Sequence, residues 1–68
     1  MSVNLFIKER SGNGNLDVSL ESVSAARAEI QSIRDRGGYE IEYDSLTDDF
    51  KFVPWHRIDF IEVTDDAN

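Results

Sequence analysis

The sequence predicts a two-layer α+β fold in which a single helix covers one face of an antiparallel or mixed sheet of about five strands. Most segments outside residues 23–36 alternate apolar and polar residues with the period of two that is typical of strands. Residues 23–36 instead repeat their apolar positions every three or four residues, as an amphipathic helix does. The element order is therefore ββαβββ. A chain of 68 residues has material for one core, so we expect one domain over residues 1–64 and a disordered acidic tail over residues 65–68.

The first two strands are expected over residues 3–9 and 15–20. In the first strand the apolar residues at positions 3, 5 and 7 share one side, and only Phe6 is apolar on the other. Residues 10–15 between them are rich in Gly and Asn, which accept the positive φ angles of hairpin turns. A Gly-rich loop can also bind phosphate, but this one lacks the lysine and the following helix of a P-loop. A hairpin turn is therefore the favoured interpretation.

The helix is expected to begin after Ser22 and to end at Gly37-Gly38. Ser22 can cap the first turn with its hydroxyl, and glycine can adopt the left-handed conformation that ends many helices. The apolar stripe of the helix consists of Val23, Ala26, Ile30 and Ile33. Arg27 and Arg34 fall on nearly the same face and could contact phosphate, but the acidic excess of the chain favours ordinary solvent exposure for them.

The next two strands are expected over residues 39–44 and 50–53, joined by a turn rich in Ser and Asp. The former alternates cleanly, with aromatic and aliphatic residues on one side and carboxylates on the other. The acidic residues of this hairpin are Glu40, Glu42, Asp44, Asp48 and Asp49. These carboxylates could bind a metal ion, but a solvated face explains them equally well and no run has the spacing of an EF-hand loop. We therefore expect no metal site.

Pro54 is expected to end the fourth strand, because proline has no N–H for a central ladder and belongs at an edge, a bulge or a strand end. Residues 55–57 then form a short turn, and residues 58–63 form the last strand. In that strand Ile58 and Phe60 fall on one face, whereas the later apolar residues fall on the other. Either a β-bulge reconciles the two patterns, or both faces of this strand are covered.

One helix can cover only one face of the sheet, so apolar residues on the other face predict an interface. The residues assigned to the helix-facing core are the helix stripe and Val3, Leu5, Ile7, Leu16, Val18, Leu20, Ile41 and Phe52. Phe6, Val53 and either Phe60 or Ile61 then remain without cover. We expect a homodimer or a partner protein to pack on them, the alternative being scattered exposed apolar residues.

The composition excludes several classes of function. Fourteen Asp and Glu against seven Lys and Arg give a net charge of -7, which repels nucleic acid and anionic lipid, so neither direct nucleic-acid binding nor membrane binding is expected. The acidity can serve solubility, halophilic adaptation, or mimicry of nucleic acid towards a basic partner. No cysteine, no signal-like start and no long apolar run occur in the sequence, so a cytoplasmic location is expected.

Residues 55–57, Trp-His-Arg, concentrate the rare side chains of the chain. His56 could act as a general base beside Arg57, but there is no cysteine and no nucleophile motif such as G-x-S-x-G, so we expect no enzyme, no catalytic residue and no cofactor. Trp and Arg are enriched at protein interfaces, which favours a contact site at this corner. The alternative is that Trp55 packs over the end of the helix.

Residues 52–58 read F-V-P-W-H-R-I, and I-E-V follows at residues 61–63. This stretch resembles the closing strand of short, uncharacterised bacteriophage and prophage accessory proteins, in which a V-P-W-H-R-I turn recurs. The resemblance is confined to this stretch. It implies a small accessory protein in the bacterial cytoplasm and transfers no catalytic residue.

These observations favour a non-enzymatic accessory protein that binds another protein, in its sharpest form a phage-type inhibitor of a host protein with a basic surface. One alternative is a structural or assembly protein, such as a virion or scaffold component, that forms homo-oligomers. Another is a small-molecule-binding domain centred on His56 and Arg57. The expected partner-binding residues are Phe6, Glu40, Glu42, Asp44, Asp48, Asp49, Trp55, His56, Arg57 and Phe60.

Overall fold

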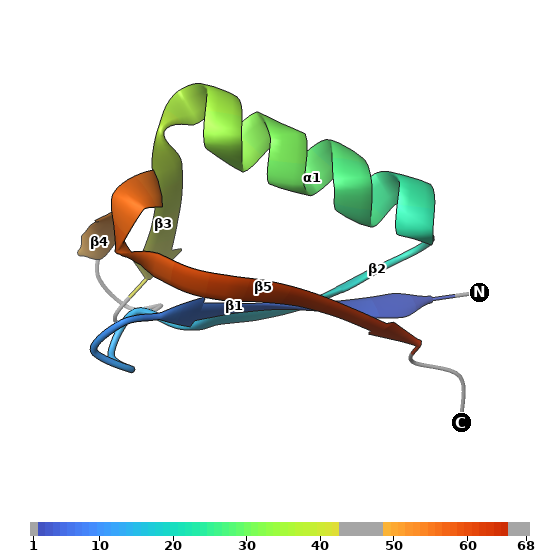
Figure 1. Cartoon of the computed structure of the whole chain (residues 1–68), viewed down its shortest axis with the longest axis horizontal. Coiled ribbons are helices and arrows are strands. Elements are labelled where there is room, and N and C mark those ends of the chain that lie inside the picture. The colour runs from blue at the N-terminus through green and yellow to red at the C-terminus, as the bar shows by residue number, and fades with distance from the viewer. Residues whose placement is uncertain (1, 43–48, 66–68) are drawn as a thin grey trace.

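A computed structural model of the chain describes residues 2–42 and 49–65, which form an α+β fold in the predicted order ββαβββ (Figure 1). The elements are β1 (Val3–Glu9), β2 (Leu16–Leu20), α1 (Val23–Arg36), β3 (Gly38–Glu42), β4 (Phe50–Pro54), a 3-10 helix η1 (Trp55–Arg57) and β5 (Ile58–Asp65). The prediction of a single sheet is wrong. The strands form two sheets, one in the order β2-β1-β5 and one of β3 and β4.

The three-stranded sheet lies beneath α1, and β1 is its central strand, antiparallel to both neighbours (Figure 1). Val3, Leu5 and Ile7 of β1 are buried on the side that faces the helix, as their alternation predicts. Leu5 and Ile7 pack with Ile33 of α1 and with buried residues of the second sheet. One core therefore holds both sheets to the helix.

Within the described residues, no helix has both the length and the apolar character that crossing a bilayer requires.

A bulge in β5 resolves the mixed pattern of the last strand, which is the first of the two expected alternatives. Lys8 of β1 lies opposite Phe60, whereas Glu9 lies opposite Ile58, so Asp59 is the extra residue. Because one residue is inserted there, the side chain of Ile61 turns towards α1 and packs against the core. Phe60 takes the opposite face and is 47% exposed.

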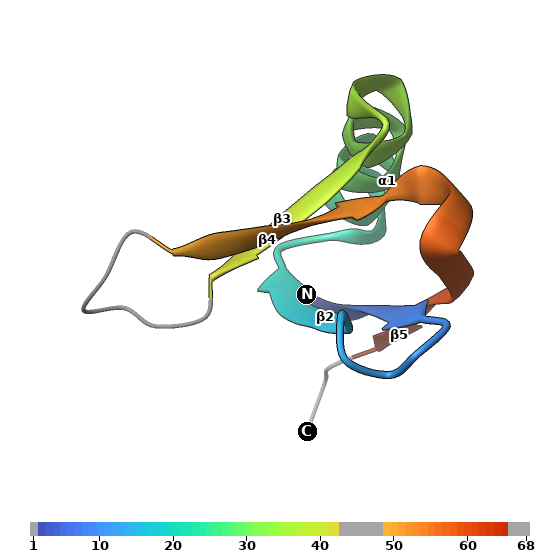
Figure 2. The same ribbon diagram turned by 90° about the vertical axis from the view of Figure 1, so that its left-hand side faces the viewer.

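The second sheet is the β3–β4 hairpin, which projects beyond the three-stranded sheet (Figure 2). Its register places Tyr39 opposite Val53 and Glu40 opposite Phe52. Tyr39 and Val53 are buried in the core, whereas Phe52 is 49% exposed. The prediction that Phe52 is a core residue and Val53 is uncovered is therefore wrong. Residues directly opposite in a hairpin share a face, so Val53 must accompany Tyr39 inward.

The helix ends where the sequence predicts. The Ser22 hydroxyl accepts a hydrogen bond from the Ala25 N–H at 3.1 Å, and Gly37, with φ of 86°, donates its N–H to the last carbonyls of α1. Gly38 has φ of 155°, and a Cβ atom on it would lie 2.1 Å from the Val53 carbonyl oxygen. The second glycine therefore allows β4 to pack directly against the start of β3. Pro54 is the last residue of β4, as expected.

Candidate protein-binding surfaces

All four phenylalanines of the chain lie outside the buried core. Phe50, Phe52 and Phe60 are 57%, 49% and 47% exposed, and Phe6 is half-buried. The buried core is instead built from aliphatic residues and Tyr39. Phenylalanine is normally among the residues most often buried, so its uniform placement outside the core needs an explanation.

The first surface, called the hairpin face, consists of Glu40, Glu42, Phe50 and Phe52. The register of the hairpin puts Glu40 opposite Phe52 and Glu42 opposite Phe50, so the four side chains share one face of the β3–β4 sheet. All four residues are exposed. Cβ atoms of directly opposite residues are about 5 Å apart, so each ring lies beside a carboxylate. The hairpin face is therefore both apolar and negatively charged.

The second surface, called the open sheet face, is the side of the three-stranded sheet that α1 does not cover (Figure 1). The rings of Phe6 and Phe60 meet there, with centroids 6.2 Å apart and planes tilted by 52°. Phe6 lies between Asp17 of β2 and Glu62 of β5, and Phe60 lies opposite Lys8. This surface therefore carries both signs of charge around a pair of rings.

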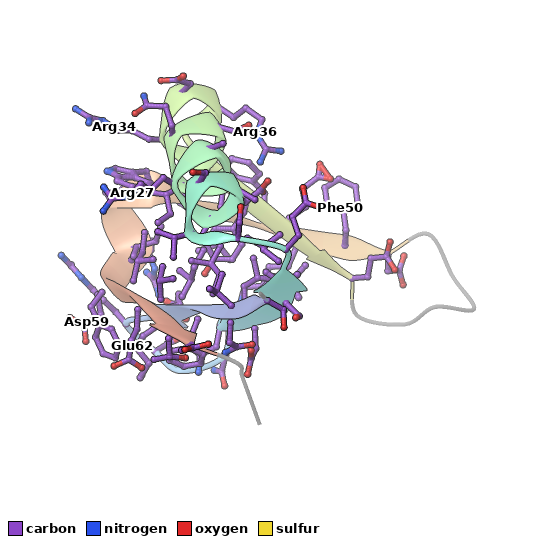
Figure 3. The ribbon with its side chains drawn as sticks, turned by 90° about the vertical axis from the view of Figure 1, so that its right-hand side faces the viewer. Arg27, Arg34, Arg36, Phe50, Asp59 and Glu62 are labelled. Carbon is purple, nitrogen blue, oxygen red and sulfur yellow. The ribbon has the colours of Figure 1, made fainter. Side chains whose placement is uncertain are left out.

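The two surfaces point in different directions. Figure 3 shows Phe50 on the hairpin at one side of the molecule, and Asp59 and Glu62 at the opposite side. The same view shows Arg27 and Arg34 on one flank of α1 and Arg36 on the other. Arg36 also pairs with Glu29 at 3.6 Å. The helix therefore does not gather its arginines into one basic patch.

The predicted corner at Trp55, His56 and Arg57 is formed by η1. The Trp55 side chain is half-buried and packs against the core, and the Trp55 backbone N–H donates to the Gly37 carbonyl at 2.7 Å. His56 is exposed. The Arg57 guanidinium binds Glu9, with its Nε and Nη2 atoms 3.2 and 3.0 Å from Oε2. His56 and Arg57 are therefore both exposed, and Arg57 is held by Glu9.

Glu9 is the residue of this corner that the sequence prediction missed. Its side chain is 2% exposed. The carboxylate accepts hydrogen bonds from the Ser11 N–H, the Gly14 N–H and the Ser11 hydroxyl, in addition to those from Arg57. The Gly-rich loop does hold an anion, but the anion is a side chain of the protein itself. Position 9 continues the buried alternation of β1, which is the signal that could have identified it.

Hydrogen bonds and charge stabilise the ionised form of Glu9. The bond from the Ser11 hydroxyl and that from the Ser11 N–H, followed by the Arg57 guanidinium, outweigh burial and lower the pKa of Glu9 from 4.5 to about 2. Tyr39 donates its hydroxyl to the Gly14 carbonyl at 2.6 Å. Burial, and after it the charge of Glu9, raises the pKa of Tyr39. This corner therefore ties the β1–β2 loop to β3 and to η1.

The remaining predicted residues divide between the surfaces. Phe6 and Phe60 meet on the open sheet face, and Glu40 and Glu42 lie on the hairpin face with Asp49 exposed nearby. Asp44 and Asp48 lie outside the described residues. Among residues 2–42 and 49–65, no cluster of three or more His, Asp or Glu side chains has the arrangement to hold a metal ion.

Comparison with known proteins gives no match to any family model, curated protein or solved structure. The surfaces themselves are therefore the basis for inferring a function.

Proposed function

We propose that this chain is a non-enzymatic protein-binding domain whose hairpin face contacts a partner with apolar and basic groups. The observation that supports it most directly is the exposure of Phe50 and Phe52, at 57% and 49%, beside two exposed carboxylates. Large aromatic side chains that remain exposed mark interfaces, because burying them on binding removes much apolar area from water. About half of each of these two residues is available to be buried on binding.

The charge of the hairpin face selects the kind of partner. Glu40 and Glu42 flank the rings, and the whole chain carries a net charge of -7. A second copy, a nucleic acid or an anionic lipid would bring like charge against this face. A protein surface with Lys or Arg around an apolar patch would instead be attracted. The resemblance of the closing strand to phage accessory proteins supports the sharpest form of the proposal, the inhibition of a host protein.

Salt dependence tests the electrostatic half of this proposal. A partner captured from bacterial lysate with the tagged chain is purified, and its Kd is measured at about 0.05 M and about 0.5 M salt, since added salt screens exposed charges. We expect the affinity of wild type to fall as salt rises. The double variant Glu40→Gln/Glu42→Gln should bind more weakly at low salt and respond less to salt.

A variant with the same charge change elsewhere is the control for this measurement. Asp17→Asn/Glu62→Gln removes two carboxylates from the open sheet face and should keep the salt response of wild type. Equal responses in the two double variants, or a wild-type affinity that does not change with salt, would contradict the electrostatic half of the proposal and leave only the apolar contact of the hairpin face.

A second candidate function is self-association through the open sheet face, as in a structural or assembly protein. The pair of Phe6 and Phe60 supports it, because the rings lie on a face that α1 leaves uncovered. Lys8 lies opposite Phe60 on the same face as Asp17 and Glu62, so this face carries both signs of charge and two copies can meet there with opposite charges paired. Such an interface is compatible with a partner on the hairpin face, which lies on another side of the molecule (Figure 3).

Sedimentation velocity over a range of concentrations tests this second candidate. We expect wild type to form a dimer as concentration rises and Phe60→Ser to shift the midpoint to at least about tenfold higher concentration. Phe50→Ser removes a ring of similar exposure from the hairpin face and should leave the midpoint unchanged. A wild type that stays monomeric throughout would exclude self-association.

A further inference from the structure

We propose that an extended peptide segment of the partner adds as a third strand to the open edge of β4, beside the hairpin face. This inference rests on the proposed function and specifies how the partner binds. Three observations support it. They are the hydrogen-bonding pattern between β3 and β4, a cavity along the edge of β4, and the charged residues on the two sides of that edge.

The ladder phase decides which backbone groups of β4 point outward. The Trp55 N–H donates to the Gly37 carbonyl at 2.7 Å, so residues 37 and 55 form a hydrogen-bonded pair that continues the register of the hairpin. Hydrogen-bonded and non-hydrogen-bonded pairs alternate along an antiparallel ladder. Lys51 and Val53 therefore bond to β3, whereas the N–H and C=O groups of Phe50 and Phe52 point to the other edge.

Pro54 supports the same phase independently. Pro54 follows Phe50 and Phe52 at every second position of β4, so its backbone nitrogen points to the same edge as theirs. A proline in a sheet belongs where its missing N–H faces away from the neighbouring strand. In the described part of the chain, β3 is the one strand that pairs with β4. The opposite edge of β4 therefore offers two N–H and two C=O groups to an incoming strand, which is the requirement for strand addition.

A cavity of about 290 Å³ lies along this edge, lined by Glu9, Lys51, Phe52, Val53, Pro54 and Arg57. Four of these residues are consecutive in β4, and successive side chains of a strand point to opposite faces. Because residues of both faces line the cavity, we infer that it runs along the edge of the strand. Because β3 occupies the other edge, the cavity lies on the open one.

The charges on either side of the edge specify the side chains of the peptide. On one side, Phe50 and Phe52 with Glu40 and Glu42 favour apolar or basic side chains. On the other side, the cavity holds two cations, Lys51 and Arg57, and one carboxylate, Glu9, which already binds Arg57. That side favours an acidic side chain. The complementary peptide alternates apolar or basic residues with acidic ones.

A second copy of β4 fits this edge less well than such a peptide. Pairing of two β4 strands through both Phe50 and Phe52 would place Lys51 directly opposite its equivalent. It would also bring Glu40 and Glu42 of each copy to the same face of the joined sheet. Like charges directly opposite one another destabilise a strand pair. The occupant argued for is therefore an extended peptide of a different protein.

The test uses the full chain and a library of random peptides about 10 residues long, enough to span a typical strand of the sheet. Peptides selected on the immobilised chain should alternate as described. Binding of a synthetic selected peptide should slow the hydrogen exchange of the Phe50 and Phe52 amides in the ¹⁵N-labelled chain. The Lys51 and Val53 amides, which bond to β3, serve as internal references because they are already protected in the free chain.

A charge swap tests the side-chain assignment. Lys51→Glu should weaken binding of the selected peptide by about tenfold, and replacing the acidic residue of the peptide by Lys should restore it. If peptides bind through Phe50 and Phe52 without slowing the exchange of those two amides, strand addition is excluded and the proposed function stands. If no peptide is enriched, strand addition is likewise excluded. If selected peptides bind equally to wild type and to Phe50→Ser/Phe52→Ser, the rings take no part and the hairpin face is contradicted, whereas the edge site is decided by the exchange of the two amides.

Discussion

Replacing Phe50 and Phe52 together by serine is expected to weaken binding of the captured partner by at least about 30-fold, the effect of losing one hot-spot contact. The two rings are the most exposed large apolar groups of the described hairpin and lie beside each other on the hairpin face. Their removal takes away the apolar area that binding would bury. Because about half of each ring already faces solvent, the variant should keep most of the stability of wild type. Calorimetric titration of the partner measures the first effect, and thermal unfolding measures the second.

The matched control exchanges the same residue types on the other surface. Phe6→Ser/Phe60→Ser removes two rings from the open sheet face and should leave the affinity for the partner unchanged. If Phe50→Ser/Phe52→Ser binds the partner as wild type does and Phe6→Ser/Phe60→Ser does not bind, the partner binds the open sheet face and the hairpin face is excluded.

Acid is expected to destabilise the chain in the pH range where Glu9 loses its charge. The pKa of Glu9 is about 2 in the folded chain, against an ordinary value of 4.5. A group whose pKa is lowered by folding contributes stability above its unfolded pKa and loses it as the pH falls towards the folded pKa. The contribution of Glu9 is therefore complete above pH 4.5 and is lost between pH 4.5 and about 2. Thermal unfolding midpoints measured across this range should fall steadily.

Glu9→Gln identifies the group responsible. Glutamine cannot form the ion pair with Arg57 and does not titrate, so this variant should be less stable than wild type at pH 7. Its stability should also change less with pH between 4.5 and 2. Glu40→Gln alters an exposed carboxylate of the hairpin and should follow wild type. If the unfolding midpoints of wild type and Glu9→Gln fall in parallel as the pH is lowered, the role given to this carboxylate is refuted.

Local sequence patterns were sufficient to predict the elements of the fold. Alternation located the strands, the Ser22 cap and the glycines at 37 and 38 bounded the helix, and Pro54 marked the end of β4. The bulge in β5 was also predictable, because the apolar residues of that strand change face. These features depend on residues that are close together in the chain.

The division into two sheets and the orientation of β4 were not predictable from such patterns. Phe52 and Val53 are adjacent, and either could be the buried one. The choice depends on the register against Tyr39, which pairs with Val53. A shift of one residue would exchange the two faces. The prediction took the wrong alternative and therefore missed that Phe50 and Phe52 form one surface with Glu40 and Glu42.

The contacts of the buried Glu9 carboxylate were not predictable for a different reason. Glu9 and Arg57 are far apart in the sequence, and their contact follows from the turn of η1 and the path of β5 beside β1. The Gly-rich loop was correctly interpreted as a hairpin connection. Its ligand is a carboxylate of the strand that precedes it, so the missing parts of a P-loop gave no indication of that ligand.

The most direct test of the central claim, that the hairpin face binds another protein, is an amide chemical-shift map of the ¹⁵N-labelled chain with the purified partner. We predict that the largest changes fall on residues 40–42 and 50–53. Changes confined to α1, or to the strands around Phe6 and Phe60 with the hairpin unchanged, would contradict the claim.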